Sequence, residues 1–256
     1  MTHNTYSFGG LLVFIAAHNE VQSLRATVQG FQECCSPADV RRIVLFLAPF
    51  CTKDCEAQAQ ALARCGYPIP VTVYKQAGRD YPKEVQAYLQ GQTDVTHAVF
   101  WIADMDIDLQ LLPQMTEQSK ENPAAVVTVS RFLQGGGLPR HRRRLDNLLS
   151  TAFAWGTRLL YLSRQTDPHF FISIFPVCDL QRVVFHERTA AAGFEFILVF
   201  ERMGKRFLEL PVQQRERSEG ASGFNIKRKL YYLKPLLRVR FTPKRKLFEE
   251  VPHAKA

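Results

Sequence analysis

The sequence predicts an α/β protein built on a mainly parallel sheet with helices on both faces. Two observations predict it. Continuous apolar runs of strand length alternate with helical patterns through the first half of the chain, and polar clusters follow several of these runs. Unbroken apolar runs are typical of strands that are buried on both faces. A chain of 256 residues that is 46% hydrophobic and 22% charged can bury a core of this size.

The first half supplies five expected strands and four expected helices. The strands are expected at Leu11–Ala17, Arg42–Leu47, Val71–Tyr74, Ala98–Ala103 and Ala125–Val129. Apolar residues at helical spacing lie between them, at Glu20–Glu33, Asp54–Arg64, Lys83–Gln90 and Leu109–Ser119. Ligands of such sheets lie beyond the carboxyl ends of the strands, so the functional site is expected at that edge.

The second half is less regular. Helices are expected at Arg144–Leu162 and Ala190–Arg202, an apolar stretch spans Phe170–Pro176, and a strand is expected at Arg206–Gln213. Phe224–Phe241 mixes basic, aromatic and aliphatic residues. Pro235 interrupts this stretch, so two short helical pieces are expected rather than one helix.

Composition and charge exclude several classes of protein. No apolar run approaches the ~20 residues that a bilayer span needs, and the first residues lack the basic start of an export signal, so a cytoplasmic location is expected. The six cysteines form no Cys-x-x-Cys pair, which favours free thiols over disulfides or a zinc site. The net charge of +9 is concentrated: Asn225–Phe248 holds nine basic residues and no acidic one. That segment favours an anionic partner.

The strongest candidate for chemistry is the acidic cluster after the fourth expected strand. Asp104 and Asp106 stand two residues apart where that strand ends, and Asp108 follows. Mg²⁺ or Mn²⁺ is commonly held by one or two carboxylates together with substrate phosphates. The alternative is a solvated strand end with no ligand.

Two further clusters lie at chain positions suited to a nucleotide. His18-Asn19-Glu20 follows the first expected strand and offers a ring and a carboxylate to a base or a ribose, although Asn19 could instead cap the following helix. Arg217 and Ser222 flank a glycine in one short loop that suits phosphate oxygens. An ordinary polar surface loop is the alternative for that segment.

Taken in order, these segments resemble the glycosyltransferase family 2 enzymes, in particular the dolichol-phosphate mannose synthase-like and polyprenyl-phosphate glycosyltransferase branch. The resembling segments span roughly residues 11–224. They are Val13–Glu20, Phe100–Asp108, Val129–Gly137 with the Arg142–Arg144 cluster, Thr166–Pro168, Glu209–Pro211 and Arg217–Ser222. The resemblance implies a GT-A fold, which is a Rossmann-like nucleotide-diphospho-sugar transferase fold.

The resemblance also implies an inverting, metal-dependent transfer of a sugar from a nucleotide-diphosphate sugar. By position, Asp104 and Asp106 match the metal-binding pair of that family. Asp108 matches a further metal ligand, and Asp104 also matches a residue that contacts the nucleotide. The implied nucleoside contacts are Ala17, His18, Asn19 and Glu20. The implied contacts to the acceptor or to phosphate are Arg131, Arg143, Arg144, Arg217 and Ser222. Asp104, Asp106, Arg217 and Asp167 are the implied catalytic residues.

The implied acceptor is a polyprenyl-phosphate lipid, whose phosphate needs no general base. A saccharide hydroxyl is the alternative acceptor, and it would need a base, for which Asp167 is the first candidate unless that residue only shapes the turn before Pro168. The sequence departs from the family pattern at Pro49-Phe50, where aspartates are usual, at Phe170–Ile172 and at Gly223. An unusual donor or an inactive, glycosyltransferase-like binding protein therefore stays open.

The resemblance divides the chain into a GT-A domain at 1–224 and a basic segment at 225–256. Within the domain, the nucleotide and metal half is about 1–130 and the acceptor half about 131–224. The basic segment suits an anionic membrane surface, which predicts a peripheral protein on the cytoplasmic face of the membrane; a solubilising charged terminus is the alternative. No zinc-finger or RNA-recognition signature accompanies the charge, so nucleic acid is not expected as a partner.

Overall fold

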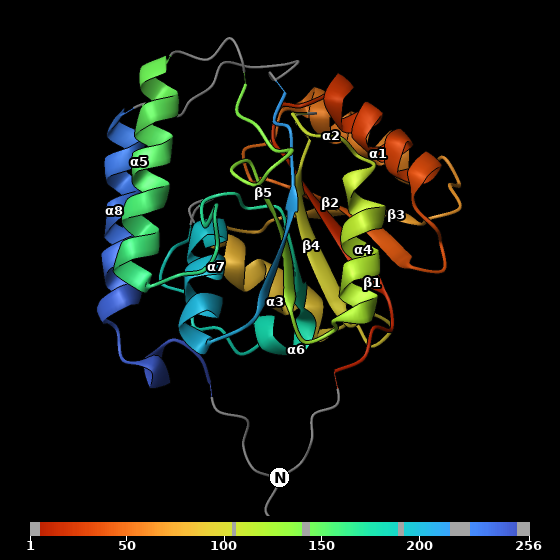
Figure 1. Ribbon diagram of the computed structural model, residues 1–256. Helices are drawn as coiled ribbons and strands as arrows, with labels where there is room; N and C mark the ends of the chain where they lie inside the picture. The colour runs from red at the N-terminus through yellow and green to blue at the C-terminus, as the bar shows by residue number, and fades with distance from the viewer. Residues whose placement is uncertain (1–5, 104–105, 140–143, 189–191, 216–225, 250–256) are drawn as a thin grey trace, which may run out of the picture.

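The computed structural model describes residues 6–103, 106–139, 144–188, 192–215 and 226–249. A seven-stranded sheet runs through its centre in the order β3-β2-β1-β4-β6-β5-β7 (Figure 1). The strands are β1 (Leu11–Ala17), β2 (Val40–Leu47), β3 (Val71–Lys75), β4 (His97–Ile102), β5 (Val126–Ser130), β6 (Ser173–Pro176) and β7 (Phe207–Pro211). All neighbouring pairs are parallel except those of β6, which is antiparallel to both β4 and β5.

Helices cover both faces of the sheet. They are α1 (Gln22–Cys34), α2 (Lys53–Ala63), α3 (Tyr81–Gln90), α4 (Leu111–Glu121), α5 (Arg144–Tyr161), α6 (Val177–Leu180), α7 (Ala192–Met203) and α8 (Ile226–Phe241), with a short 3-10 helix at Lys244–Lys246. In Figure 1, α1, α2 and α4 lie on one side of the sheet, and α3, α6 and α7 on the other. Helices α5 and α8 form a further layer outside α7 (Figure 1).

The core divides into two clusters, one on each face of the sheet. Along β1, the side chains alternate between them: Leu11, Val13 and Ile15 pack toward α1, α2 and α4, whereas Leu12 and Phe14 pack toward α3 and α7. Every residue of β1 from Leu11 to Ile15 is fully buried. This two-sided burial explains why the strand reads as an unbroken apolar run.

The expected strands and helices of the first half are confirmed to within a few residues. In the second half, the helices at α5 and α7 and the strand at β7 are also confirmed. The apolar stretch Phe170–Pro176 contains β6, whose antiparallel direction the sequence did not predict.

The expectation of two helical pieces around Pro235 is wrong, because α8 continues through this residue. Pro235 lacks an N–H, so the helix loses one backbone hydrogen bond there. Leu236 and Val239 are buried just beyond it, in the core cluster that contains α7, and the Tyr161 hydroxyl donates to the Leu236 carbonyl at 2.7 Å. This packing and the added hydrogen bond offset the missing one. The described part of the basic C-terminal segment is therefore integral to the fold.

Candidate active site

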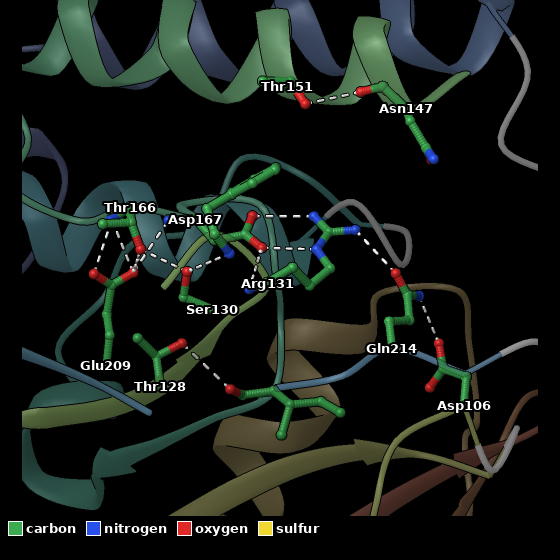
Figure 2. Close-up of polar contacts among 12 residues, drawn as sticks. Asp106, Thr128, Ser130, Arg131, Asn147, Thr151, Thr166, Asp167, Glu209 and Gln214 are labelled. Atoms are coloured by element: carbon green, nitrogen blue, oxygen red, sulfur yellow. Dashed lines mark hydrogen bonds and ion pairs between the residues drawn. The ribbon is translucent and has the colours of Figure 1, made fainter. Parts of the chain in front are cut away.

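The carboxyl ends of β1, β4, β5 and β7 meet at one edge of the sheet. The order of the strands reverses between β1 and β4, which is where α/β sheets commonly hold their ligands. Because β6 is antiparallel, the segment that enters it also lies at this edge and brings Asp167 there. Polar residues from both halves of the chain are thus placed together (Figure 2).

At the centre of this edge, Arg131 and Asp167 form a two-point ion pair. The Arg131 Nε donates to Asp167 Oδ2 at 2.7 Å and its Nη2 donates to Oδ1 at 3.0 Å. The Arg131 backbone N–H adds a third bond to Oδ2 at 3.2 Å. The Asp167 side chain is fully buried and that of Arg131 is 10% exposed. The guanidinium also lies over the Phe170 ring at 4.8 Å, so its plane is fixed from two directions.

A second layer of hydrogen bonds holds Asp167 in place. The Glu209 carboxylate, on β7, accepts from the backbone N–H groups of Thr166 and Asp167 and from the Thr166 hydroxyl (Figure 2). The Thr166 hydroxyl also lies 2.5 Å from that of Ser130, the last residue of β5. Burial raises the pKa of Glu209 above its ordinary value, and the hydrogen bonds to its carboxylate oppose that rise. The Arg131–Asp167 pair is therefore preorganised by β5 and β7.

Gln214 joins this ion pair to the end of β4. Its Oε1 accepts from Arg131 Nη1 at 3.1 Å, and its Nε2 donates to Asp106 Oδ2 at 2.8 Å (Figure 2). The loop Gly135–Gly137 sets the position of Gln214, because the Gln214 N–H donates to the Gly137 carbonyl. Gly135 has a φ of +90°, and a Cβ on Gly136 would lie 2.7 Å from the Ser130 carbonyl oxygen, so this close turn needs glycine.

The acidic cluster after β4 divides into one buried and one exposed carboxylate. Asp106 is buried, and no described residue hydrogen-bonds to its Oδ1. Asp108 is 56% exposed; its Oδ1 accepts from the Gln110 N–H and its Oδ2 pairs with Arg215 at 3.0 Å. Among the described residues, no group of three or more His, Cys, Asp or Glu side chains could hold a metal ion. Asp106 still fits a Mg²⁺ or Mn²⁺ ion that takes one or two carboxylates and completes its shell with substrate phosphates.

The residues predicted to contact the nucleoside lie at the ends of β1 and β2. The His18 ring contacts the Phe50 ring edge-on at a centroid distance of 4.7 Å, and the Arg79 guanidinium lies 5.9 Å from Phe50. Phe50 is 57% exposed. The Glu20 carboxylate accepts from the backbone N–H groups of His18 and Asn19, at 2.7 and 3.0 Å. Glu20 therefore shapes this turn, and Asn19 does not cap α1, whose N-terminus has no side-chain cap.

Helix α5 carries further polar groups, and in Figure 2 it passes above the Arg131–Asp167 pair. In Figure 2 the Asn147 amide extends from α5 on the side where Arg131 and Gln214 lie. Asn147 Oδ1 is buried and has no hydrogen-bond partner among the described residues. Two residues beyond Asp167, His169 contacts the Thr157 hydroxyl of α5 at 2.8 Å and stacks on Phe194 at 4.6 Å. Burial lowers the pKa of His169 to about 4, so it is neutral at pH 7.

The residues predicted from the sequence fall into three groups. The structure places Asp106, Asp167 and Arg131 in one hydrogen-bonded chain, and it places Ala17, His18, Asn19 and Glu20 at the neighbouring strand end. Asp108 is beside them but paired with Arg215, and Arg144 is the first residue of α5. Asp104, Arg143, Arg217 and Ser222 lie outside the described residues.

Three residues of this edge were not predicted from the sequence. Gln214 stands three residues after β7, and its position after a strand end is the only signal in the sequence that could have found it. In the sequence, Phe50 stands out only as a departure from a family pattern, and the structure shows that it contacts His18. Asn147 carries no local signal, because single polar residues are common within helices.

Comparison with known proteins gives matches among solved structures only. The sequence matches no protein-family profile and no curated protein. The crystal structure of glucosyl-3-phosphoglycerate synthase from Mycobacterium tuberculosis with uridine-diphosphate has a TM-score of 0.65 and 13% identity, over 91% of this chain and 81% of that one. The complex of that enzyme with Mn²⁺, uridine-diphosphate-glucose and phosphoglyceric acid has the same TM-score and identity, over 91% and 80%. A further mycobacterial protein also has a TM-score of 0.65 at 13% identity, over 91% and 75%.

This likeness establishes the fold. The chain has the GT-A fold of nucleotide-sugar transferases, with the polar residues described above at the carboxyl edge of its sheet.

Proposed function

We propose that this protein is a metal-dependent glycosyltransferase, which moves a sugar from a nucleotide-diphosphate sugar to a phosphorylated acceptor, a polyprenyl-phosphate lipid. The observation that carries the proposal is the continuous chain Asp106–Gln214–Arg131–Asp167 at the carboxyl edge of a GT-A fold. It links an acidic group suited to a metal-bound diphosphate with a cation suited to a second phosphate. The similar mycobacterial enzyme was crystallised with both kinds of ligand, a nucleotide sugar with Mn²⁺ and phosphoglyceric acid.

The donor's nucleoside is assigned to the ends of β1 and β2. The exposed ring of Phe50 offers a stacking surface for a base, and His18 and Arg79 flank it. Stacking tolerates different bases because every base has a π-face. The lack of an aspartate at Pro49-Phe50 is thus consistent with a donor whose base is held by stacking rather than by a carboxylate.

The diphosphate is assigned to the end of β4. Asp106, with Asp104 predicted beside it, would hold Mg²⁺ or Mn²⁺, and the bound ion offsets the charge that develops on the leaving nucleoside diphosphate. Gln214 keeps the Asp106 carboxylate oriented through its 2.8 Å hydrogen bond. Arg217 and Ser222 are the further phosphate contacts that we propose from the sequence alone.

The acceptor's phosphate is assigned to Arg131 and Asn147, with Arg143 and Arg144 as further contacts proposed from the sequence. Arg131 uses three of its five N–H groups on Asp167 and Gln214, which leaves two for a ligand. A phosphate oxygen of the acceptor attacks the anomeric carbon, the bond from that carbon to the donor's β-phosphate oxygen breaks, and the configuration inverts. Both oxygens of Asp167 bind Arg131, which fits a positioning role rather than that of a base.

Transfer assays with matched variants test this proposal. The wild-type protein, Mn²⁺ and labelled uridine- and guanosine-diphosphate sugars are incubated with polyprenyl phosphate or with phosphoglyceric acid. Asp106→Asn is expected to lower the rate of transfer at least about a hundredfold and to change the melting temperature little. Asp94→Asn is the matched control, because Asp94 lies at the amino edge of the sheet in a half-exposed ion pair with Arg42.

Three results would count against the proposal as stated. Full activity of Asp106→Asn would exclude the assigned site. Transfer to phosphoglyceric acid or to a saccharide hydroxyl, but not to polyprenyl phosphate, would exclude the lipid acceptor. Nucleoside diphosphate binding with Mn²⁺ but without transfer to any acceptor would favour the inactive binding protein.

A further inference from the structure

Helix α5 is apolar on two opposite sides, which is unusual for a helix at the surface. Its inner side packs on the core through Phe153, Ala154 and Leu160. Its outer side carries four large apolar residues and Leu162 follows directly after the helix, with exposed fractions that run from 62% at Trp155 to 81% at Leu162. These five are Leu145, Leu148, Trp155, Leu159 and Leu162. Scattered apolar residues are common on protein surfaces, but a continuous row marks an interaction site.

The neighbouring helix also exposes apolar residues. Leu233, Leu237 and Phe241 recur at every fourth residue of α8 and are exposed, Phe241 by 73%. Helices α5 and α8 lie side by side in the outer layer of the molecule (Figure 1). Arg240 Nε donates to the Leu160 carbonyl at 2.7 Å, so the two helices are bonded near their C-termini. We call the exposed apolar residues of the two helices together the α5–α8 face.

Basic residues accompany the α5–α8 face. The two helices contain eight basic residues and one acidic residue, Asp146. Lys234 is exposed, and so are Lys244, Arg245 and Lys246 just beyond α8; none of these four pairs with a described carboxylate. The Arg158 guanidinium lies 4.6 Å from the Trp155 ring, which places a cation beside an exposed indole. Indole rings with nearby cations are typical of the region where lipid headgroups meet acyl chains.

We propose that the α5–α8 face docks on an anionic lipid bilayer, with both helices lying in the plane of the interface. No helix among the described residues is long and apolar enough to cross a bilayer, so contact from one side is the form of attachment available to them. Apolar side chains enter the acyl boundary, and Lys234 and Lys244–Lys246 meet the anionic headgroups. The α5–α8 face, rather than the charged C-terminal residues alone, is thus the anchor.

A second copy of the chain fits this face less well than lipid does. The outer residues of α5 follow a spacing of three and four, as in a coiled coil, but coiled coils pair opposite charges at the flanking positions. Here those positions hold Leu149, Thr151, Gly156 and Arg158, and none is acidic. Two copies would also bring like charges together, whereas an anionic surface attracts them.

The docking proposal depends on the proposed function in one respect only, which is that the function explains why docking on a bilayer would be useful. Leu145 and Leu148 lie in the first turns of α5, the end of the helix from which Asn147 extends on the Arg131 side (Figure 2). A lipid phosphate in a bilayer against the α5–α8 face would therefore lie near the assigned acceptor site. Docking itself is measurable without any donor or acceptor.

Vesicle flotation at moderate salt tests the docking. The full chain is expected to float with vesicles of phosphatidylglycerol and phosphatidylcholine and to stay behind with phosphatidylcholine alone. Leu148→Ser with Leu159→Ser is expected to weaken binding at least tenfold. Leu148→Met with Leu159→Met is the matched control and should bind like the wild type. Lys244→Glu with Lys246→Glu should weaken binding to the anionic vesicles only.

Other outcomes would overturn the proposal. If the variant with both leucines changed to serine floats as well as the wild type does, another surface attaches the protein. A wild-type dimer that becomes monomeric in the serine variant, with no binding to vesicles, would assign the face to a second copy. Because both leucines are exposed, the melting temperature should hardly change; if it falls, Phe241→Ser on α8 repeats the test. Lack of sugar transfer by a protein that floats would refute the proposed function and leave the docking intact.

Discussion

The two ends of the carboxyl edge are built differently. On the side that we propose for the acceptor, Asp167 is fully buried and Arg131 and Glu209 are partly buried, and hydrogen bonds from β5, β7 and the entry to β6 connect them. On the side that we propose for the nucleoside, Phe50 is more than half exposed and His18 contacts it through a ring edge. Substitutions in a buried hydrogen-bond network cost much stability, whereas an exposed ring can be replaced with little effect on the fold. We therefore expect fold stability and phosphate binding to be coupled on the proposed acceptor side, and stability and base binding to be separate on the proposed nucleoside side.

The largest effect is expected from Asp167→Ala. This change leaves the nearly buried Arg131 guanidinium without its counter-ion, which typically costs about 3–5 kcal/mol of unfolding free energy. Urea denaturation measures it. Asp108→Asn is the control, since its partner Arg215 is 61% exposed and exposed pairs contribute about 1 kcal/mol or less. Equal losses in the two variants would remove the contrast between the buried and the exposed side.

The next largest effect is expected in the pH dependence of the free energy of unfolding, to which His169 contributes. Its folded-state pKa is about 4 and its unfolded-state pKa is near 6.5, so below pH 6.5 the unfolded chain binds a proton that the folded protein does not. The contribution of His169 to the free energy of unfolding is fully present above pH 6.5. It is lost as the pH falls toward 4, and the loss reaches up to about 3 kcal/mol.

Urea denaturation between pH 7 and pH 4 checks this prediction. His169→Gln should flatten the acid limb of the stability curve. The Gln variant should also be less stable than the wild type at pH 7, because it loses the stacking on Phe194. An acid limb of unchanged slope in the variant would assign the proton uptake to other groups.

A smaller effect is expected at Phe50. Phe50→Ala removes the exposed ring and should raise the dissociation constant for a nucleoside diphosphate with Mn²⁺ about tenfold, as removal of a stacking platform typically does. Calorimetry measures it. Phe241→Ala is the matched control, because Phe241 is also exposed but lies on α8. The unfolding free energy should change by less than about 1 kcal/mol in both variants. A large loss of stability in Phe50→Ala alone would show that the nucleoside side is also part of the core.

The smallest effect is expected from Gln214→Glu, which keeps the size of the side chain. The new carboxylate loses the donor to Asp106 and places two like charges together, while Arg131 keeps its partner at that position. We expect transfer to fall about tenfold, through kcat rather than through the KM of the acceptor. Steady-state kinetics at two Mn²⁺ concentrations separates this from a simple loss of metal affinity.

The sequence by itself determined the layered α/β architecture, since apolar runs such as Leu11–Ala17 can be buried only between two helical layers. It also determined which strand ends carry polar side chains, because those ends follow directly from the runs. Only the tertiary structure decided the rest. The antiparallel direction of β6 brings Asp167 to Arg131, and packing on the core carries α8 through Pro235. Gln214 and the outward row of α5 likewise depend on contacts between segments far apart in the chain, and local sequence patterns do not record such contacts.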